Sequence, residues 1–119
     1  VVGARRAMCS PILLRGAQFG LGVDRPRLFE SNMPIYAPQG RARRVAAAAC
    51  GVYGVRPDGR RLRTRADGSE LRAAASVAEA SEAMGGMSWM SWDGLREAIP
   101  PAYTEYLGQE LLYAMAALA

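Results

Sequence analysis

The stretch FGLGVDRPRLFESN, residues 19–32, decides the fold expected for this chain. Its glycines supply a loop, and the alternation over residues 27–30 is typical of a strand that leaves such a loop. Before it, ILL at residues 12–14 is a short apolar run that suits a buried strand. After it, Met33-Pro34 and Ala37-Pro38 disfavour a helix, because a residue before proline avoids the helical region. We therefore expect an extended path over residues 31–40.

The last third of the chain carries the clearest helix signals. Ser76 and Glu79 have the spacing of a capping box, and Gly85-Gly86 can end the short helix that follows. Ser91 suits the N-cap of a second helix over residues 92–98. Pro100-Pro101 then breaks the chain, and the second proline fits the first turn of a final helix. That helix carries an apolar stripe made of Tyr103, Leu107, Leu111, Met115 and Leu118.

The middle of the chain is strongly basic. Nine of the 15 basic residues, all of them Arg, fall within residues 41–72, whereas residues 73–119 hold one Arg and six acids. Turn signals around residues 57–59 and 66–69 predict either a two-stranded basic hairpin or a poorly ordered loop. Residues 45–52 suit a strand or a short helix. The exclusive use of Arg fits phosphate or carboxylate recognition by guanidinium groups, or a GC-rich coding sequence.

Several classes of site and segment are disfavoured. The chain has no His, so it lacks the usual base at neutral pH and most zinc ligands, and we predict no metal site. Cys9 and Cys50 lie too far apart for a C-x-x-C unit, so buried free thiols are expected, with a disulfide as the alternative. No apolar run of 18 residues indicates a transmembrane helix.

Two of these segments together resemble the DNA (cytosine-5)-methyltransferases, especially the short phage and actinobacterial type. The run Arg25-Pro26-Arg27-Leu28-Phe29 is similar to the family's arginine motif, and AIPPAYTEYLG at residues 98–108 is similar to its C-terminal motif. GVYG at residues 51–54 and MGGMSWMSW at residues 84–92 also fit the family's order. Family members also carry an F-x-G-x-G cofactor loop, a Pro-Cys nucleophile and a Glu-Asn-Val strand end, and none of these occurs here. Residues 1–5 are similar to the residues that follow the Glu-Asn-Val motif in family members.

The resemblance implies an α/β fold: a partial Rossmann-like sheet with few strands, followed by two or three C-terminal helices. Residues 1–119 would form one partial domain, with an arginine-motif segment (1–40), a basic variable region (41–75) and C-terminal helices (76–119). It implies that Arg25 and Arg27 are ancestral contacts to the flipped target cytosine and its phosphates. The alternative is that Arg25 pairs with Asp24 or Glu30 and anchors a loop.

The resemblance also implies two further sites. Residues Ala98, Ile99 and Pro100 would line the pocket for S-adenosylmethionine. The variable region would contact DNA through Arg41, Arg43, Arg44, Arg60, Arg61, Arg63 and Arg65. An Arg-rich solvated loop, or one docked on an acidic protein or lipid surface, fits the same residues.

Three functions follow as expectations. The chain is a subunit of a split cytosine-5 methyltransferase, inactive alone, whose partner supplies the nucleophile and completes the S-adenosylmethionine site. The second expectation is a non-catalytic structural subunit of a larger assembly, which includes an assembly bound to a membrane. The third is an Arg-rich module that binds nucleic acid. In the first two cases a partial sheet and an apolar helix surface would favour association with a protein partner.

Overall fold

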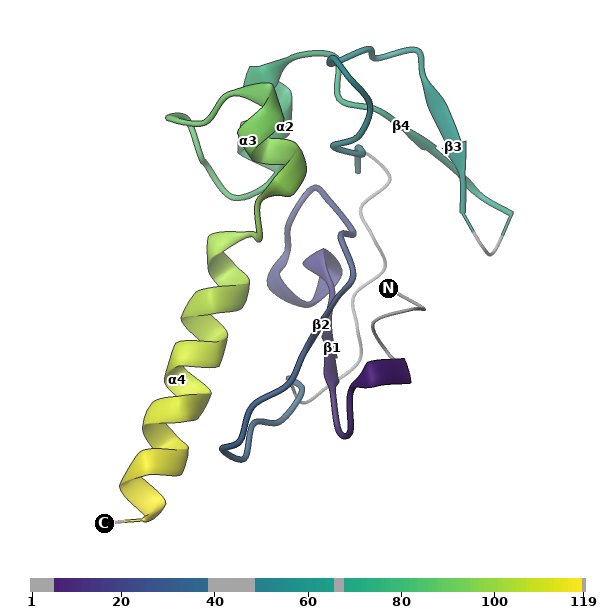
Figure 1. Cartoon of the computed structure of the whole chain (residues 1–119). Helices are drawn as coiled ribbons and strands as arrows, with labels where there is room; N and C mark the ends of the chain where they lie inside the picture. Colours follow the sequence, from purple (N-terminus) through teal and green to yellow (C-terminus); the bar gives the residue numbers. More distant parts are fainter. Residues whose placement is uncertain (1–5, 39–48, 66–67, 119) are drawn as a thin grey trace.

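The computed structural model describes residues 6–38, 49–65 and 68–118 and shows a mixture of helices and short strands (Figure 1). In chain order the elements are β1 (Ile12–Leu14), the 3-10 helix η1 (Gly16–Phe19), β2 (Arg27–Phe29), β3 (Leu62–Thr64), β4 (Glu70–Arg72), α2 (Val77–Ala83), α3 (Trp92–Glu97) and α4 (Pro101–Ala117). The described strands form two antiparallel pairs, β1 with β2 and β3 with β4. The expected mixture of helix and strand is confirmed, and a Rossmann-like origin stays a prediction.

The first strand pair is closed by a tight loop around η1. Leu14 lies opposite Arg27 and is fully buried, whereas the outer end of the pair sets Ile12 against Phe29. Gly16 donates its amide to the Asp24 carbonyl at 2.6 Å. A Cβ atom at Gly16 would lie only 1.7 Å from the Val23 carbonyl oxygen, so this turn requires glycine.

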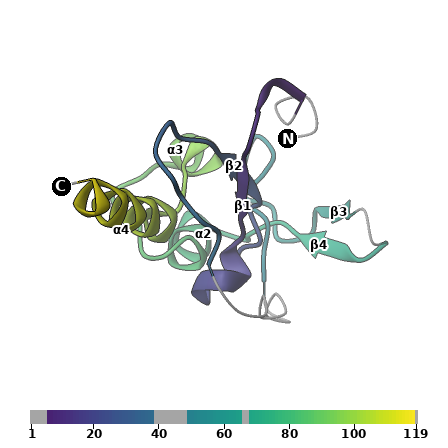
Figure 2. The same cartoon turned by 90° about the horizontal axis from the view of Figure 1, so that it is seen from below.

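The second strand pair confirms the hairpin alternative for the basic region. Leu62 pairs with Arg72 and Thr64 with Glu70, so the two strands run side by side toward residues 66–67. The hairpin extends from the body on the side opposite α4, as both views show (Figures 1 and 2). A single parallel bridge between Gly51 and Ala73 joins its base to the GVYG segment. Residues 45–48 lie outside the described residues, and residues 49–52 hold this bridge but no helix.

The helices begin where their caps predict. The Ser76 hydroxyl accepts from the Glu79 amide at 3.1 Å, and the Ser91 hydroxyl accepts from the Gly94 amide at 3.2 Å. Gly85 and Gly86, at φ 107° and 87°, end α2. Helix α4 begins at Pro101, as predicted.

The core lies where α2 and α3 pack against the loops that follow η1 and precede the hairpin. Its buried members are Val23, Cys50, Val52, Ala74, Ala80, Met84, Met87, Trp92 and Leu95. Both cysteines are free, as expected, but the prediction that both are buried is wrong for Cys9, which is exposed. Among the described residues no helix is long and apolar enough to span a bilayer.

Candidate functional site

Arg25 joins the arginine motif to the end of α3. Its guanidinium donates to four carbonyl oxygens: Ala98 at 2.8 Å, Leu95 at 3.0 Å, Arg96 at 2.5 Å and Val52 at 3.4 Å. Three of these oxygens belong to the C-terminal turn of α3, where a helix leaves carbonyl groups without intrahelical partners. The positive guanidinium also opposes the partial negative charge at that helix end. Every nitrogen of the Arg25 guanidinium is therefore occupied by the chain itself.

The environment of Arg25 favours this internal role. Burial, and then the neighbouring charge of Arg27, lowers the pKa of Arg25 to about 10, so that the group stays protonated at neutral pH. The alternative in which Arg25 pairs with Asp24 or Glu30 is wrong. Asp24 instead forms a two-bond ion pair with Arg15, at 3.0 and 2.6 Å. Glu30 accepts hydrogen bonds from backbone amides.

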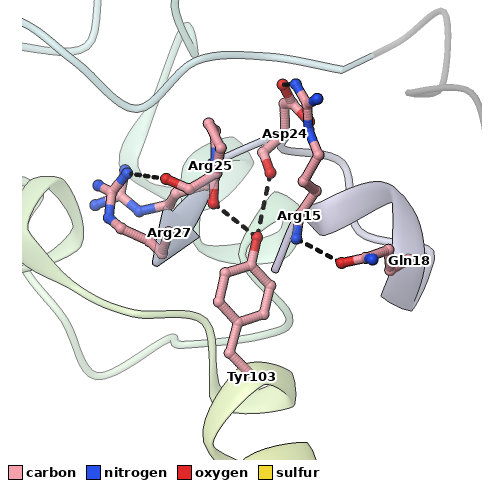
Figure 3. Close-up of polar contacts among 7 residues, drawn as sticks. Arg15, Gln18, Asp24, Arg25, Arg27 and Tyr103 are labelled. Atoms are coloured by element: carbon pink, nitrogen blue, oxygen red, sulfur yellow. Dashed lines mark hydrogen bonds and ion pairs between the residues drawn. The ribbon is translucent and has the colours of Figure 1, made fainter. Parts of the chain in front are cut away.

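Tyr103 holds the arginine motif from the other side. It is the one buried residue of α4 among those described, and its hydroxyl bonds to the carbonyl oxygens of Arg25 at 2.8 Å and Asp24 at 3.2 Å (Figure 3). Its ring lies 5.3 Å from that of Phe19 and 6.3 Å from that of Phe29, measured between centroids. Burial, and then the Asp24 carboxylate, raises the pKa of Tyr103 to about 12, so the hydroxyl remains a donor.

Arg27 differs from Arg25 in how its donors are used. It is half-buried on β2, and within the described residues its guanidinium has one hydrogen bond, from Nη1 to the Pro26 carbonyl at 2.8 Å (Figure 3). The remaining guanidinium N–H groups of Arg27 can donate to a ligand. The two arginines of the motif therefore differ in their hydrogen bonding: Arg25 is bonded within the chain, whereas Arg27 has donors left for a ligand.

The turn before α4 meets this cluster at Ala98. Ala98 is the C-cap of α3, in an extended conformation, and its carbonyl accepts from Arg25 Nε. Pro100 is fully buried, whereas Ile99 is 40 % exposed. The structure therefore brings Ala98 into contact with Arg25 and leaves the Ile99 side chain partly open to a ligand or a partner.

The basic residues of the hairpin form a separate surface. Arg63 lies in the middle of β3, and Arg61 and Arg65 directly flank the strand, where backbone bonds to Ala73 and Ser69 continue the pairing. The three arginines therefore share one face, which we call the arginine face. The Arg63 guanidinium lies 4.7 Å above the centre of the Tyr53 ring. The Tyr53 hydroxyl bonds to the carbonyl oxygens of Arg61 at 2.9 Å and of Leu71 at 2.7 Å. Tyr53 thus fixes the base of the arginine face.

The other basic residues of this region lie outside the arginine face or outside the described residues. Arg60 is exposed at the turn into β3, and its amide bonds to the Asp58 carboxylate at 3.0 Å. Arg41, Arg43 and Arg44 lie outside the described residues. On the opposite face of the hairpin, Arg72 is paired with Glu79 at 2.6 Å.

Sequence reasoning missed two tyrosines that organise these sites. The sequence pattern places Tyr103 only in an apolar stripe, although its position in the first turn of the helix that follows Pro100-Pro101 marks it as an anchor. Tyr53 stands out in the sequence only as part of GVYG, yet an aromatic residue near alternating arginines is a signal for cation–π stacking.

Comparison with known proteins adds no assignment. No protein-family model matches this chain, and neither a curated protein nor a solved structure matches it. The contacts within the chain therefore carry the functional argument.

Proposed function

We propose that this chain is the DNA-contacting part of a cytosine-5 DNA methyltransferase and that a partner polypeptide completes the active site. One observation carries the proposal. The two segments that resemble the family, residues 19–32 and 98–108, meet through Arg25 and Tyr103, which bond to Ala98 and to the Arg25 carbonyl respectively. Segments that lie about 70 residues apart and form one buried polar cluster are expected to serve one site.

The chemistry of cytosine methylation gives Arg27 its role. A methyl donor cannot reach C5 inside a duplex, so the base must leave the stack and be held in a pocket. Arg27 has unused N–H donors that can bond to the base carbonyl or to a flanking phosphate. Each nitrogen of the Arg25 guanidinium already bonds to the chain, and four of its five N–H groups donate to carbonyl oxygens. We therefore assign the DNA contact to Arg27.

The nucleophile comes from outside this sequence in the proposal. The family uses a thiolate in a Pro-Cys dipeptide, whereas Cys9 follows Met8 and Cys50 follows Ala49. Burial, and then the Glu79 carboxylate, raises the pKa of the Cys50 thiol, which disfavours the reactive thiolate. A partner with the Pro-Cys dipeptide would supply the attacking sulfur.

Residues 98–100 would form only one side of a pocket for S-adenosylmethionine. Ile99 offers a partly exposed apolar side chain beside the buried Pro100, which suits one face of a nucleoside. When bound, this cofactor supplies the methyl group. The glycine loop that binds the rest of it would belong to the partner, so we expect no tight cofactor binding by the chain alone.

The arginine face of the hairpin supports the DNA-contacting part of the proposal. On the arginine face, Arg61, Arg63 and Arg65 have no ion pair among the described residues, and the stacked Arg63 is held in place for a phosphate. Such contacts would position the duplex, while Arg27 would act at the extruded base.

One observation also fits a second candidate, the structural subunit. Four apolar side chains at the C-terminal end of α4 are between 60 and 76 % exposed: Leu112, Tyr113, Met115 and Leu118. An apolar surface of this kind serves protein association. It fits docking of the methyltransferase partner and equally docking within an assembly that has no catalysis.

Native mass spectrometry of the chain isolated from its source, followed by a methyl-transfer assay, tests the proposal. We expect a complex with a polypeptide that contains Phe-x-Gly-x-Gly and Pro-Cys, and this complex should transfer labelled methyl groups to cytosine in duplex DNA. Arg27→Ala should abolish most of the transfer, whereas Arg6→Ala, a charge-matched change at an exposed residue, should not. An assembly without those motifs, and without transfer, would favour the structural subunit.

A further inference from the structure

We infer that Arg25 is a positioning residue that never contacts DNA, and that it forms with Tyr103 a clamp coupling the residue 98–100 turn to Arg27. The DNA side of this inference rests on the proposed function. The coupling itself rests only on contacts within the chain.

The first half of the clamp is the Arg25 guanidinium. The side chain extends from its position just before Pro26 to the end of α3. There Nε donates to the Ala98 carbonyl and Nη2 to the Leu95 carbonyl. The Leu95 carbonyl also accepts from the Ala98 amide at 3.3 Å, whereas the Ala98 carbonyl lies beyond the last residue of α3. Releasing the guanidinium to bind DNA would remove this donor from the Ala98 and Arg96 carbonyl groups in a partly buried place, at a cost that one new phosphate contact does not recover. Arg25 therefore stays bonded to the protein.

The second half of the clamp is the Tyr103 hydroxyl. Arg25 has φ 39°, in the left-handed region that non-glycine residues rarely adopt. Such a conformation persists when its surroundings fix it. Tyr103 bonds to the Arg25 carbonyl at 2.8 Å, and its helix, α4, begins directly after the residue 98–100 turn. The peptide group of Arg25 is thus held from α4 while its side chain is held from α3.

The clamp transmits position to Arg27 over a very short path. Pro26 separates the two arginines, and its ring fixes its own φ near −65°. The orientation of Arg25 therefore sets where β2 begins and where the Arg27 side chain leaves the backbone. A ligand or partner that moves the residue 98–100 turn would shift Arg27 through this path, so the two halves of the proposed site are coupled.

A double-mutant cycle measures this coupling on DNA. The probe is a labelled duplex with one unpaired cytosine, and its binding to the full chain is followed by fluorescence anisotropy. Because a typical hydrogen bond contributes a modest net free energy, we expect Tyr103→Phe and Arg25→Lys each to weaken binding about 2- to 10-fold. In an Arg27→Ala background neither change should have a further effect, since both act through Arg27. Additive losses for Arg25→Lys would mean that Arg25 contacts DNA and would overturn the inference.

Hydrogen exchange tests the clamp without any ligand. Tyr103→Phe should raise amide exchange in peptides covering residues 23–29 and 95–100, while the β3–β4 hairpin keeps its exchange rates. Tyr106→Phe is the matched control, because its hydroxyl bonds to the Tyr36 carbonyl outside the clamp. Unchanged exchange in both peptides refutes the coupling, as does an increase of equal size throughout the chain. If exchange responds as expected but the probe does not bind, the clamp stands and the proposed DNA contact fails.

Discussion

The positive charge of the β3–β4 hairpin is concentrated on one face, which makes its role measurable. Arg61, Arg63 and Arg65 share the arginine face, whereas the other face carries Glu70 together with Arg72, which is paired with Glu79. The perturbation is the triple variant in which all three arginines become alanine. The strand pairing is made by backbone groups, so the hairpin should survive the change, and only its charge should be lost.

The expected effect follows from counterion release. Each phosphate neutralised on duplex DNA contributes about 0.9 to the slope of log affinity against log salt concentration, so three contacts contribute about 2.7. Between about 50 and about 200 mM salt, this share of the affinity falls roughly 40-fold. The triple variant should lose this salt-dependent share. Tyr53→Leu, which removes the ring beneath Arg63 and the hydroxyl bonds at the hairpin base, should weaken binding yet keep the slope.

The assay is fluorescence anisotropy with a fully paired duplex of arbitrary sequence, titrated at several salt concentrations. Arg6→Ala controls for the general effect of removing a positive charge from an exposed position. A triple variant whose slope equals that of the unchanged chain would show that the arginine face does not contact phosphates. Binding that depends on sequence and not on salt would refute the reasoning in a different way, because it would assign these arginines to base edges.

Two further predictions concern stability. Gly16→Ala should lower the free energy of unfolding by about 3 kcal/mol or more, because its Cβ would collide with the Val23 backbone. Gly20→Ala, at φ 70° with open space around the new Cβ, should cost about 1–2 kcal/mol. Chemical denaturation measures both values. The hydrogen bond from Arg72, and then that from the Ala75 amide, lowers the pKa of Glu79. The Glu79 carboxylate therefore stabilises the fold above its unfolded-state pKa, about 4.3. This stabilisation is lost as the pH falls through the lower folded-state pKa. Glu79→Gln should therefore lower the urea midpoint near pH 6 and leave it unchanged near pH 2, and an equal loss at both values would contradict this linkage.

The sequence predicted the parts of this fold that depend on local chemistry. Ser76 and Ser91 cap α2 and α3 because a side-chain oxygen reaches an amide three residues ahead, which spacing alone reveals. The two turn signals that flank an alternating run predicted either a hairpin or a poorly ordered loop, and the pairing of β3 with β4 shows the hairpin. Cys9 shows the limit: a thiol is often buried, but its place in this chain leaves it exposed. Whether a residue is covered depends on elements distant in sequence.

The candidate site shows the same limit more sharply. The resemblance to the arginine motif implies that Arg25 and Arg27 both contact one ligand. The strand begins at Arg27, as the alternation over residues 27–30 predicts, whereas Arg25 lies before it at φ 39°, outside the alternation of a strand. The acceptors that hold Arg25 in this conformation lie some 70 residues later, at the end of α3. No local sequence pattern predicts these acceptors. For that reason the sequence could not show that Arg25 bonds within the chain while Arg27 keeps free donors for a ligand.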